Sequence, residues 1–291
     1  MGVLDRIVAH KREELAGRTR QTPLAEMRRR AADAPPARPF HQVLISSWPA
    51  SPPLGGPPAL RGPDGGAAGV RLIAEVKGSS PSAGTIRAEF DPVAIARTYA
   101  AAGAAAVSVL TDARFFAGAD DHLTRVRAAV DVPVLRKDFT VDPYQVYEAR
   151  AIGADAVLLI VAVLDRGVLA DLASLAADLG MAALIEAHTE AEVAAALAVR
   201  AALLGLNNRN LDTLETSLEV TRRLRPLVPA GVTVVAESGI EERQDVEEMD
   251  RLGVHAVLVG TALMRSPDPG ARVRELLGVP AHPARSERRG A

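Results

Sequence analysis

The sequence predicts a single (β/α)8 barrel, an α/β TIM barrel, preceded by an N-terminal helical extension. Eight short apolar runs recur between residues 71 and 278, the segments between them carry helix start signals, and most runs are continuously apolar. Continuous apolar character is typical of parallel strands that helices cover on both faces. A span of roughly 200 residues suits this barrel. A doubly wound open sheet is the alternative that the same pattern allows.

The N-terminal segment predicts helices outside the barrel. Val3, Leu4, Ile7, Val8 and Leu15 recur at helical spacing, and a polar-rich helix is expected over 23–32. We therefore assign 1–47 to a helical extension.

Two further segments have compositions that do not pack. Residues 48–70 are rich in proline and glycine, so we expect a flexible insertion there. The polar tail over 279–291 is expected to be disordered, which leaves 71–278 as the catalytic barrel.

The barrel units follow in order along the chain. Asp91-Pro92 and Asp142-Pro143 each place a capping oxygen before a proline suited to a first helical turn, and Thr189 with Glu192 forms a capping-box pattern. The expected strands are 72–76, 106–110, 133–135, 156–161, 183–185, 203–206, 232–236 and 256–259.

Composition excludes several functional classes. The 291 residues carry 34 basic against 36 acidic side chains, a net charge of −2, so no global field attracts nucleic acid or an anionic membrane. The absence of cysteine excludes disulfides, thiolate zinc sites and thiol nucleophiles. The six histidines lack ligand spacing, so we expect no metal. No signal-peptide core or membrane-length apolar run is present, which favours a cytoplasmic protein.

Charged and polar side chains end several of the apolar runs. In a barrel the carboxyl ends of all strands meet at one face, so these residues are expected to converge on one mouth. Each has an ordinary structural alternative: Lys137 could extend to solvent, Glu186 could cap a helix, and Arg209 could form a surface ion pair. The converging set is Glu75, Lys77, Lys137, Glu186, Asn207, Arg209 and Glu237.

The last two strands end in small residues. Ser238-Gly239 follows the seventh strand and Gly260-Thr261 follows the eighth, where exposed backbone N–H groups near helix N-termini favour a phosphate. Tight turns are the alternative explanation for either glycine alone. Together, at adjacent strand ends, they favour a phosphate site.

These motifs, taken in order, resemble the indole-3-glycerol-phosphate synthase family. Any one motif would be weak, but the set covers nearly all of 71–265. The matching segments are 72–77 with 80–82, 108–112 with 115–118, 135–139, 158–161, 184–186, 205–211, 235–240 and 259–264.

The resemblance implies an enzyme of tryptophan biosynthesis that needs no metal or organic cofactor. Members close the ring of 1-(2-carboxyphenylamino)-1-deoxyribulose 5-phosphate, releasing carbon dioxide and water to give indole-3-glycerol phosphate. By their matches, Lys137 is the general acid and Lys77 contacts the substrate carboxylate and serves as a second acid. Glu186 is a base or holds the catalytic lysine, and Glu75 is a further candidate base.

The resemblance also implies the binding residues. Phe116 and Phe139 would pack the anthranilate ring, although an ordinary core position is their alternative. Asn207, Arg209 and Glu237 would bind substrate in the pocket, and the phosphate would contact Ser80, Ser238, Gly239, Gly260 and Thr261.

The chain departs from the family in the loop after the first strand. Gly78, Ser79 and Ala83 stand where many members carry lysines, so phosphate attraction or loop closure is expected to be weaker. The remaining alternatives are another phosphate-binding barrel, such as phosphoribosylanthranilate isomerase, or a non-catalytic scaffold. We expect a phosphorylated small-molecule substrate, no nucleic-acid or membrane partner, and a monomer or weak homo-oligomer.

Overall fold

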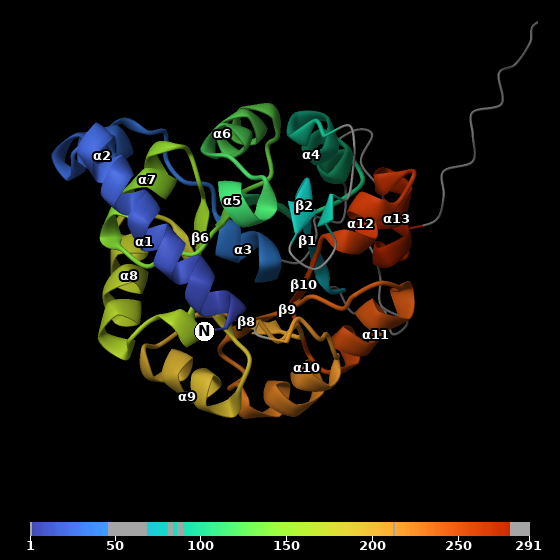
Figure 1. Cartoon of the computed structure of the whole chain (residues 1–291). Coiled ribbons are helices and arrows are strands. Elements are labelled where there is room, and N and C mark those ends of the chain that lie inside the picture. Colours follow the sequence, from blue (N-terminus) through green and yellow to red (C-terminus); the bar gives the residue numbers. More distant parts are fainter. Residues whose placement is uncertain (1, 46–68, 81–83, 86–89, 212, 280–291) are drawn as a thin grey trace, which may run out of the picture.

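Eight parallel strands close into a barrel in this computed structural model (Figure 1), which describes residues 2–45, 69–80, 84–85, 90–211 and 213–279. β1 pairs with both β4 and β10, so the sheet has no edge and the open-sheet alternative is wrong. The predicted barrel is confirmed. Its strands are β1 (Arg71–Val76), β4 (Ala106–Leu110), β5 (Val134–Lys137), β6 (Ala156–Ile160), β7 (Ala182–Ala187), β8 (Leu203–Asn207), β9 (Thr233–Glu237) and β10 (Ala256–Val259).

Four strands continue further than the apolar pattern predicts. Lys137 pairs with Leu110 in the sheet, and Glu186 pairs with Ile160, so both candidate side chains lie within strands. Asn207 and Glu237 pair with each other at the ends of β8 and β9. The ladder hydrogen bonds are made by the backbone, so pairing continues where the side chains become polar. Strand placement holds these side chains more rigidly than a loop would.

Helices form a ring outside the barrel (Figure 1). The predicted caps at Asp91 and Asp142 are present, because each carboxylate accepts backbone N–H groups of the following turn. The capping box at Thr189 is only half formed, since the Glu192 carboxylate accepts the N–H of His188 rather than that of Thr189. The ring comprises α4 (Pro92–Ala101), α6 (Asp120–Ala129), α7 (Pro143–Ala151), α8 (Arg166–Asp178), α9 (Glu190–Ala198), α10 (Glu219–Leu224), α11 (Arg243–Arg251) and α13 (Pro269–Leu277).

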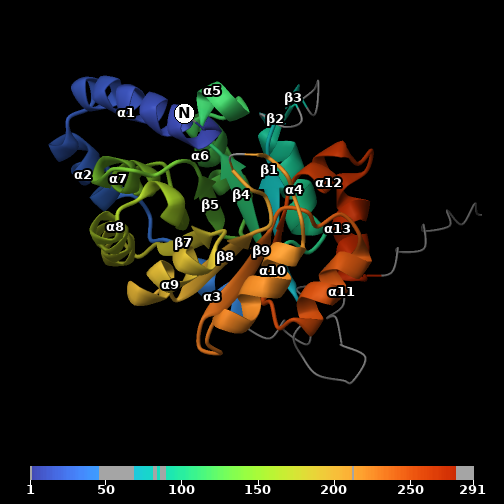
Figure 2. The same ribbon diagram turned by 60° about the horizontal axis from the view of Figure 1, so that its bottom comes forward.

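The N-terminal helices lie at both ends of the barrel. α1 (Val3–Gln21) crosses the carboxyl end of the strands, whereas α3 (Phe40–Ile45) lies at the opposite end (Figure 2). α2 (Leu24–Asp33) packs against α7. The sequence pattern anticipated α1 and α2 but not the short α3.

Several other short elements also escaped sequence prediction, because a segment of two to six residues carries little periodicity. They are the hairpin strands β2 (Ser79–Ser80) and β3 (Gly84–Thr85), the helices α5 (Ala113–Phe116) and α12 (Thr261–Arg265), and the 3₁₀ turns η1 (Val161–Val163) and η2 (Arg225–Leu227).

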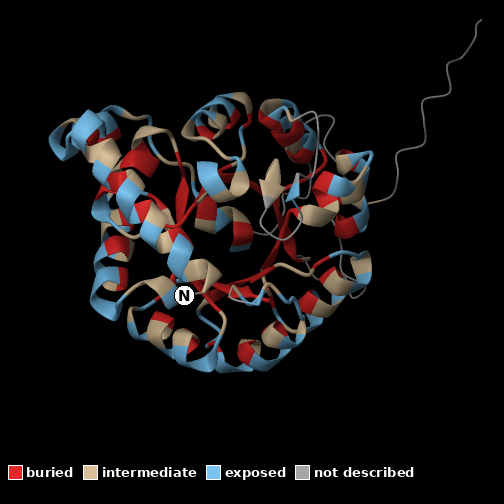
Figure 3. Ribbon diagram, viewed as in Figure 1, coloured by how far each residue is buried: buried red, intermediate tan, exposed pale blue. Residues whose placement is uncertain are grey.

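Two apolar layers surround the strands, which are buried almost throughout (Figure 3). One layer lies between the strands and the outer helices. The other fills the barrel interior, where Phe40 and Leu44 of α3 join Ile73, Leu135 and Leu184. The side chains of the described residues therefore fill the barrel at its amino end.

The predicted flexible insertion over 48–70 and the predicted disordered tail over 279–291 lie outside the described residues, apart from residues 69, 70 and 279. None of the helices in the described ranges combines the length and apolar character that crossing a bilayer requires.

Candidate active site

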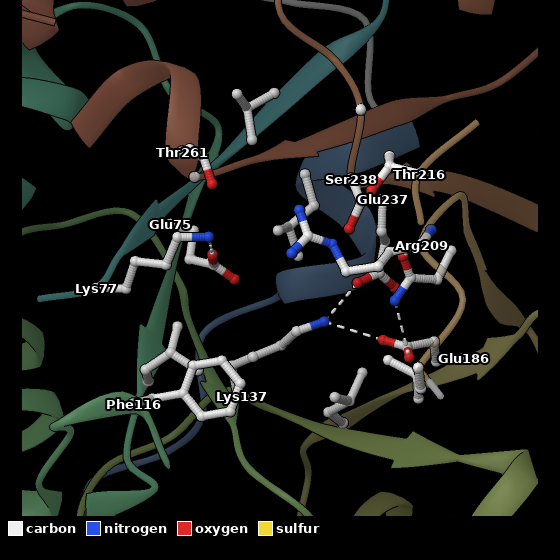
Figure 4. A pocket seen from close by; sticks show the side chains of 18 of the residues that line it. Glu75, Lys77, Phe116, Lys137, Glu186, Arg209, Thr216, Glu237, Ser238 and Thr261 are labelled. Atoms are coloured by element: carbon white, nitrogen blue, oxygen red, sulfur yellow. Dashed lines mark hydrogen bonds and ion pairs between the residues drawn. The ribbon is translucent and has the colours of Figure 1, made fainter. Parts of the chain in front are cut away.

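A cavity of about 340 Å³ opens at the carboxyl end of the barrel (Figure 4). Its wall includes side chains from β1, β5, β7, β8 and β9, which are far apart in the sequence. The structure brings together here all seven converging candidates, Glu75, Lys77, Lys137, Glu186, Asn207, Arg209 and Glu237.

Lys137 lies between two buried carboxylates. Its Nζ is 3.0 Å from Glu186 Oε2 and 2.5 Å from Glu237 Oε2, and Figure 4 shows the ammonium pointing between them. Burial alone would lower the pKa of Lys137, but the carboxylates of Glu186, Glu237 and Glu75 outweigh it and raise the pKa above its ordinary value. Lys137 is therefore a fixed cation at neutral pH.

The two carboxylates around Lys137 differ in their other contacts. Glu186 Oε1 accepts a hydrogen bond from Asn207 Nδ2 at 3.1 Å. Burial would raise the pKa of Glu186, but Lys137 and His188 lower it below its ordinary value. Burial and the charge of Glu186 raise the pKa of Glu237 to about 7 although Lys137 opposes this. The pair therefore shares one proton near neutral pH, on the Glu237 side.

Glu75 and Lys77 form a second ion pair, with Nζ 2.7 Å from Oε1. Burial would raise the pKa of Glu75, but Lys77 and Lys137 lower it. Gly260 of the last strand–helix junction lies against this pair, and a Cβ at position 260 would meet both Glu75 Oε1 and Lys77 Nζ. The glycine therefore makes room for the ion pair, in addition to the phosphate role expected from the sequence.

The backbone after β9 and β10 has the form of an anion site. Ser238 and Gly239 have φ values of 64° and 77°, in the left-handed region, and Gly260 precedes α12. Within the described part of the chain, the N–H groups of Ser238, Gly239, Gly260 and Thr261 donate to no backbone carbonyl. Successive N–H groups in such turns attract anions. All four residues line the cavity, whereas the Ser80 side chain lies outside what the structure describes.

Asn208 holds this turn and was missed by the sequence analysis. Its Nδ2 donates to the carbonyl of Ser238 at 3.0 Å, and its Oδ1 accepts both the N–H and the hydroxyl of Thr221. It lies in the motif 205–211, directly after Asn207 at the end of β8, and it is not among the residues that line the cavity.

Part of the cavity wall is apolar. The rings of Phe116 and Phe139 lie 6.2 Å apart between centroids at 37°, and both line the cavity. Val3, Leu4 and Ile7 of α1 add to this wall, which the sequence analysis did not anticipate. A cavity lined by both apolar and charged side chains suits an aromatic ligand that carries ionised groups.

A buried ionic network under α1 was also missed. Lys11 Nζ is 2.9 Å from Asp112 Oδ2 and 3.0 Å from Asp138 Oδ1, and all three side chains are at most 2% exposed. Asp138 directly follows Lys137, the last residue of β5, and lines the cavity while its carboxylate contacts Lys11 of α1. The signal was the placement of Lys11 between Ile7 and Leu15 at four-residue spacing, on the buried face of α1.

The described residues contain no group of three or more histidine or carboxylate side chains arranged to hold a metal ion. His188 lies beside the site, with Nε2 3.5 Å from Glu186 Oε1. The sequence analysis gave this histidine no role.

Comparison with known proteins gives consistent results. Residues 59–276 match the family model described as indole-3-glycerol phosphate synthase. Two relatives with that name, from Roseiflexus castenholzii and Bordetella pertussis, are each 48% identical, over 95% and 94% of this chain and 98% of each relative.

Solved structures with similar folds are more distant in sequence. A 3-hexulose-6-phosphate synthase from Salmonella typhimurium has a TM-score of 0.58 at 14% identity, covering 71% of this chain and 96% of its own. Thiamine phosphate pyrophosphorylase from Pyrococcus furiosus has a TM-score of 0.53 at 20% identity, covering 72% and 94%. These two likenesses support the barrel fold alone.

Proposed function

The chain belongs to the indole-3-glycerol phosphate synthase family, and from that premise we propose which of its side chains carry the reaction. The enzyme is a decarboxylating carbon–carbon lyase of tryptophan biosynthesis, and its substrate is a phosphorylated small molecule. The reaction closes the pyrrole ring of 1-(2-carboxyphenylamino)-1-deoxyribulose 5-phosphate and yields indole-3-glycerol phosphate. The assignment of roles rests on one observation above all, the ammonium of Lys137 held by two carboxylates inside the cavity.

Lys137 acts in ring closure. The aromatic carbon that bears the carboxylate attacks the substrate ketone, and the carbonyl oxygen becomes an alkoxide. A fixed ammonium stabilises that developing charge and donates a proton to it. The raised pKa of Lys137 keeps it protonated for this step, and an alkoxide is basic enough to take the proton.

Lys77 acts at the substrate carboxylate and in dehydration. Loss of carbon dioxide returns the bonding electrons to the ring system, and the remaining hydroxyl must then leave as water. Lys77, paired with Glu75 at 2.7 Å, donates the proton that makes water the leaving group.

Glu186 removes the last ring proton. A base must be ionised when it acts, and the lowered pKa of Glu186 meets that requirement at neutral pH. Glu75 is the other carboxylate available, and its ion pair with Lys77 suits it better to orienting that lysine.

Binding divides between the two ends of the cavity. The phosphate lies at the backbone N–H groups of Ser238, Gly239, Gly260 and Thr261, with Ser80 a further contact from the loop after β1. The anthranilate ring packs on Phe116 and Phe139. Asn207, Arg209 and Glu237 hold the polar groups between them. Gly78 and Ser79 leave the β1 loop without further lysines, so the backbone cradle carries most of the phosphate affinity.

We also propose that the protein is cytoplasmic, binds no nucleic acid and is a monomer or a weak homo-oligomer, with one catalytic barrel over 71–278 and a helical extension over 1–47. The balanced charge supports the absence of a nucleic-acid partner. Sedimentation velocity across a concentration series measures the oligomeric state, and a stable dimer at every concentration would contradict this assignment.

An enzyme assay tests the activity on which all of the proposed roles depend. The full chain is treated with a chelator, its fold is checked by circular dichroism, and the carboxyanilino substrate is added while indole fluorescence is recorded. We expect turnover without added metal or cofactor. A folded sample that gives no fluorescent product would refute the proposed mechanism.

A further inference from the structure

We propose that His188 is a positioning residue for Glu186, holding that carboxylate ionised and directed at Lys137. This inference deepens the proposed function and rests on it, because it assumes that Glu186 serves as the base. It concerns a histidine outside every motif that the sequence analysis used.

The position of His188 in the chain brings its ring to Glu186. His188 directly follows β7, two residues after Glu186, so the two side chains project to the same face of the strand. His188 Nε2 lies 3.5 Å from Glu186 Oε1, and Nδ1 lies 3.4 Å from Glu192 Oε2. The imidazole therefore lies between two carboxylates, one in the cavity and one on α9.

Burial makes the Glu186 contact important. The His188 side chain is 12% exposed, and within the described residues its Nε2 is buried without a hydrogen-bond partner. A buried ring N–H without a partner is costly, so a small closure towards Glu186 Oε1 is favoured. Catalytic hydrogen bonds are often long before substrate binds and shorten afterwards.

Charge favours the doubly protonated ring. Burial would lower the pKa of His188, but Glu192, Glu186 and Glu237 raise it above its ordinary value. An imidazolium donates from both nitrogens, which matches an acceptor on each side. The charged groups around the ring are Glu186 on β7, Glu192 on α9 and Glu237 on β9, with Lys137 on β5 beyond Glu186.

The imidazolium decides where the shared proton resides. Glu186 already accepts from Lys137 on Oε2 and from Asn207 on Oε1, and His188 adds a positive charge on the Oε1 side. Among the described residues, the cation in direct contact with Glu237 is Lys137, and the His188 ring contacts Glu186 rather than Glu237. The proton shared by the two carboxylates therefore stays on Glu237, and Glu186 remains available as the base.

A purely structural role for His188 is separable from this one. The backbone N–H of His188 donates to Glu192 Oε2 at 2.7 Å and so caps the start of α9. That contact survives any non-proline replacement at position 188. A side-chain substitution therefore removes the imidazole while the cap remains.

The pH profile of the full-length enzyme tests the inference. We expect the His188→Gln variant to keep its substrate KM within about 2-fold, while kcat falls about 10-fold at pH 6 and recovers by about pH 8, because a base without its cation titrates higher. His122→Gln on α6 is the matched control and should keep the wild-type profile. A loss of kcat in His188→Gln that is equal at every pH would overturn the proposal. So would a profile of kcat against pH whose acidic limb lies where the wild-type limb lies.

A second measurement does not depend on turnover. The His188 imidazole is titrated by NMR in the wild-type protein and in Glu186→Gln. We expect the pKa of His188 to fall in the variant, because one carboxylate partner is lost. An unchanged pKa of His188 in Glu186→Gln would overturn the inference. If this pKa falls in the variant but the wild-type protein shows no turnover, only the proposed function is contradicted.

Discussion

The carboxylate of Glu237 occupies the space that a side chain at Gly205 would fill. The two residues lie on the neighbouring strands β9 and β8, and a Cβ built on Gly205 would collide with Glu237 Oε1. The backbone at position 205 is not in the left-handed region, so conformation does not require a glycine there. A glycine is required there because the Glu237 carboxylate approaches the backbone closely. Gly205 is thus part of the arrangement that holds Glu237 beside Lys137.

Replacement of Gly205 by alanine should damage the site more than the fold. The added methyl displaces the Glu237 carboxylate, and a misplacement of about 1 Å can cost roughly 100-fold in rate. We expect kcat/KM of Gly205→Ala to fall by about that factor, measured by indole fluorescence. Gly167→Ala in α8 is the control, because a Cβ there meets nothing within 4 Å. Equal activity of the two variants would show that Glu237 has no required position.

Loss of the Lys137 ammonium should abolish most turnover. Lys137→Met keeps the length of the side chain but removes both the proton donor and the charge between Glu186 and Glu237. A general acid contributes about 100-fold to 10,000-fold, so kcat should fall by at least 100-fold. Circular dichroism and single-turnover assays separate this loss from unfolding. A folded variant with near-normal kcat would identify another group as the acid.

The raised pKa of Glu237 predicts a pH dependence of stability. Its ordinary value is 4.5 and its folded value is about 7, so the folded state holds a proton that the unfolded chain releases. This contribution is fully present below about pH 4.5 and is lost as the pH rises through about 7.

The Glu237→Gln variant isolates that contribution. The unfolding free energy of the wild type, taken relative to the variant, should fall between pH 5 and pH 7 by at most about 1.4 kcal/mol per pH unit, the value for one proton. Urea denaturation of both proteins at pH 5, 6 and 7 gives the difference. A difference that grows with pH would mean that the proton is held elsewhere.

The barrel and the composition of its mouth were predictable because both rest on short-range sequence signals. Apolar runs mark strands, and a closed parallel barrel brings their polar ends together whatever their distance in sequence. Lys137 and Glu186 therefore could be assigned to one site before any coordinates. Their mutual distances could not, because they depend on strand pairing and on rotamers.

The residues that escaped prediction act through contacts across the fold. In the sequence Gly205 is an ordinary strand glycine, and its role appears only when the fold places Glu237 beside it. His188 is an isolated histidine in the sequence, and its contact with Glu186 appears only in the structure. α3 is too short to show periodicity, yet it closes the barrel with Phe40. In each case the role depends on a contact that only the folded structure shows.

Lys11 should contribute strongly to stability. Its ammonium neutralises Asp112 and Asp138, which are each about 1% exposed, and Asp112 also accepts the N–H of Phe115 while Asp138 accepts the hydroxyl of Thr111. Lys11→Met keeps the shape of the side chain but leaves two buried carboxylates without this cation. Breaking a buried pair in this way costs about 3–5 kcal/mol, so the urea midpoint should fall markedly. The control is Arg29→Met, an exposed partner of Glu26 on α2, which should leave the midpoint unchanged. A Lys11→Met protein as stable as wild type would show that Arg136, 3.5 Å from Asp138, balances the charge of the network without Lys11.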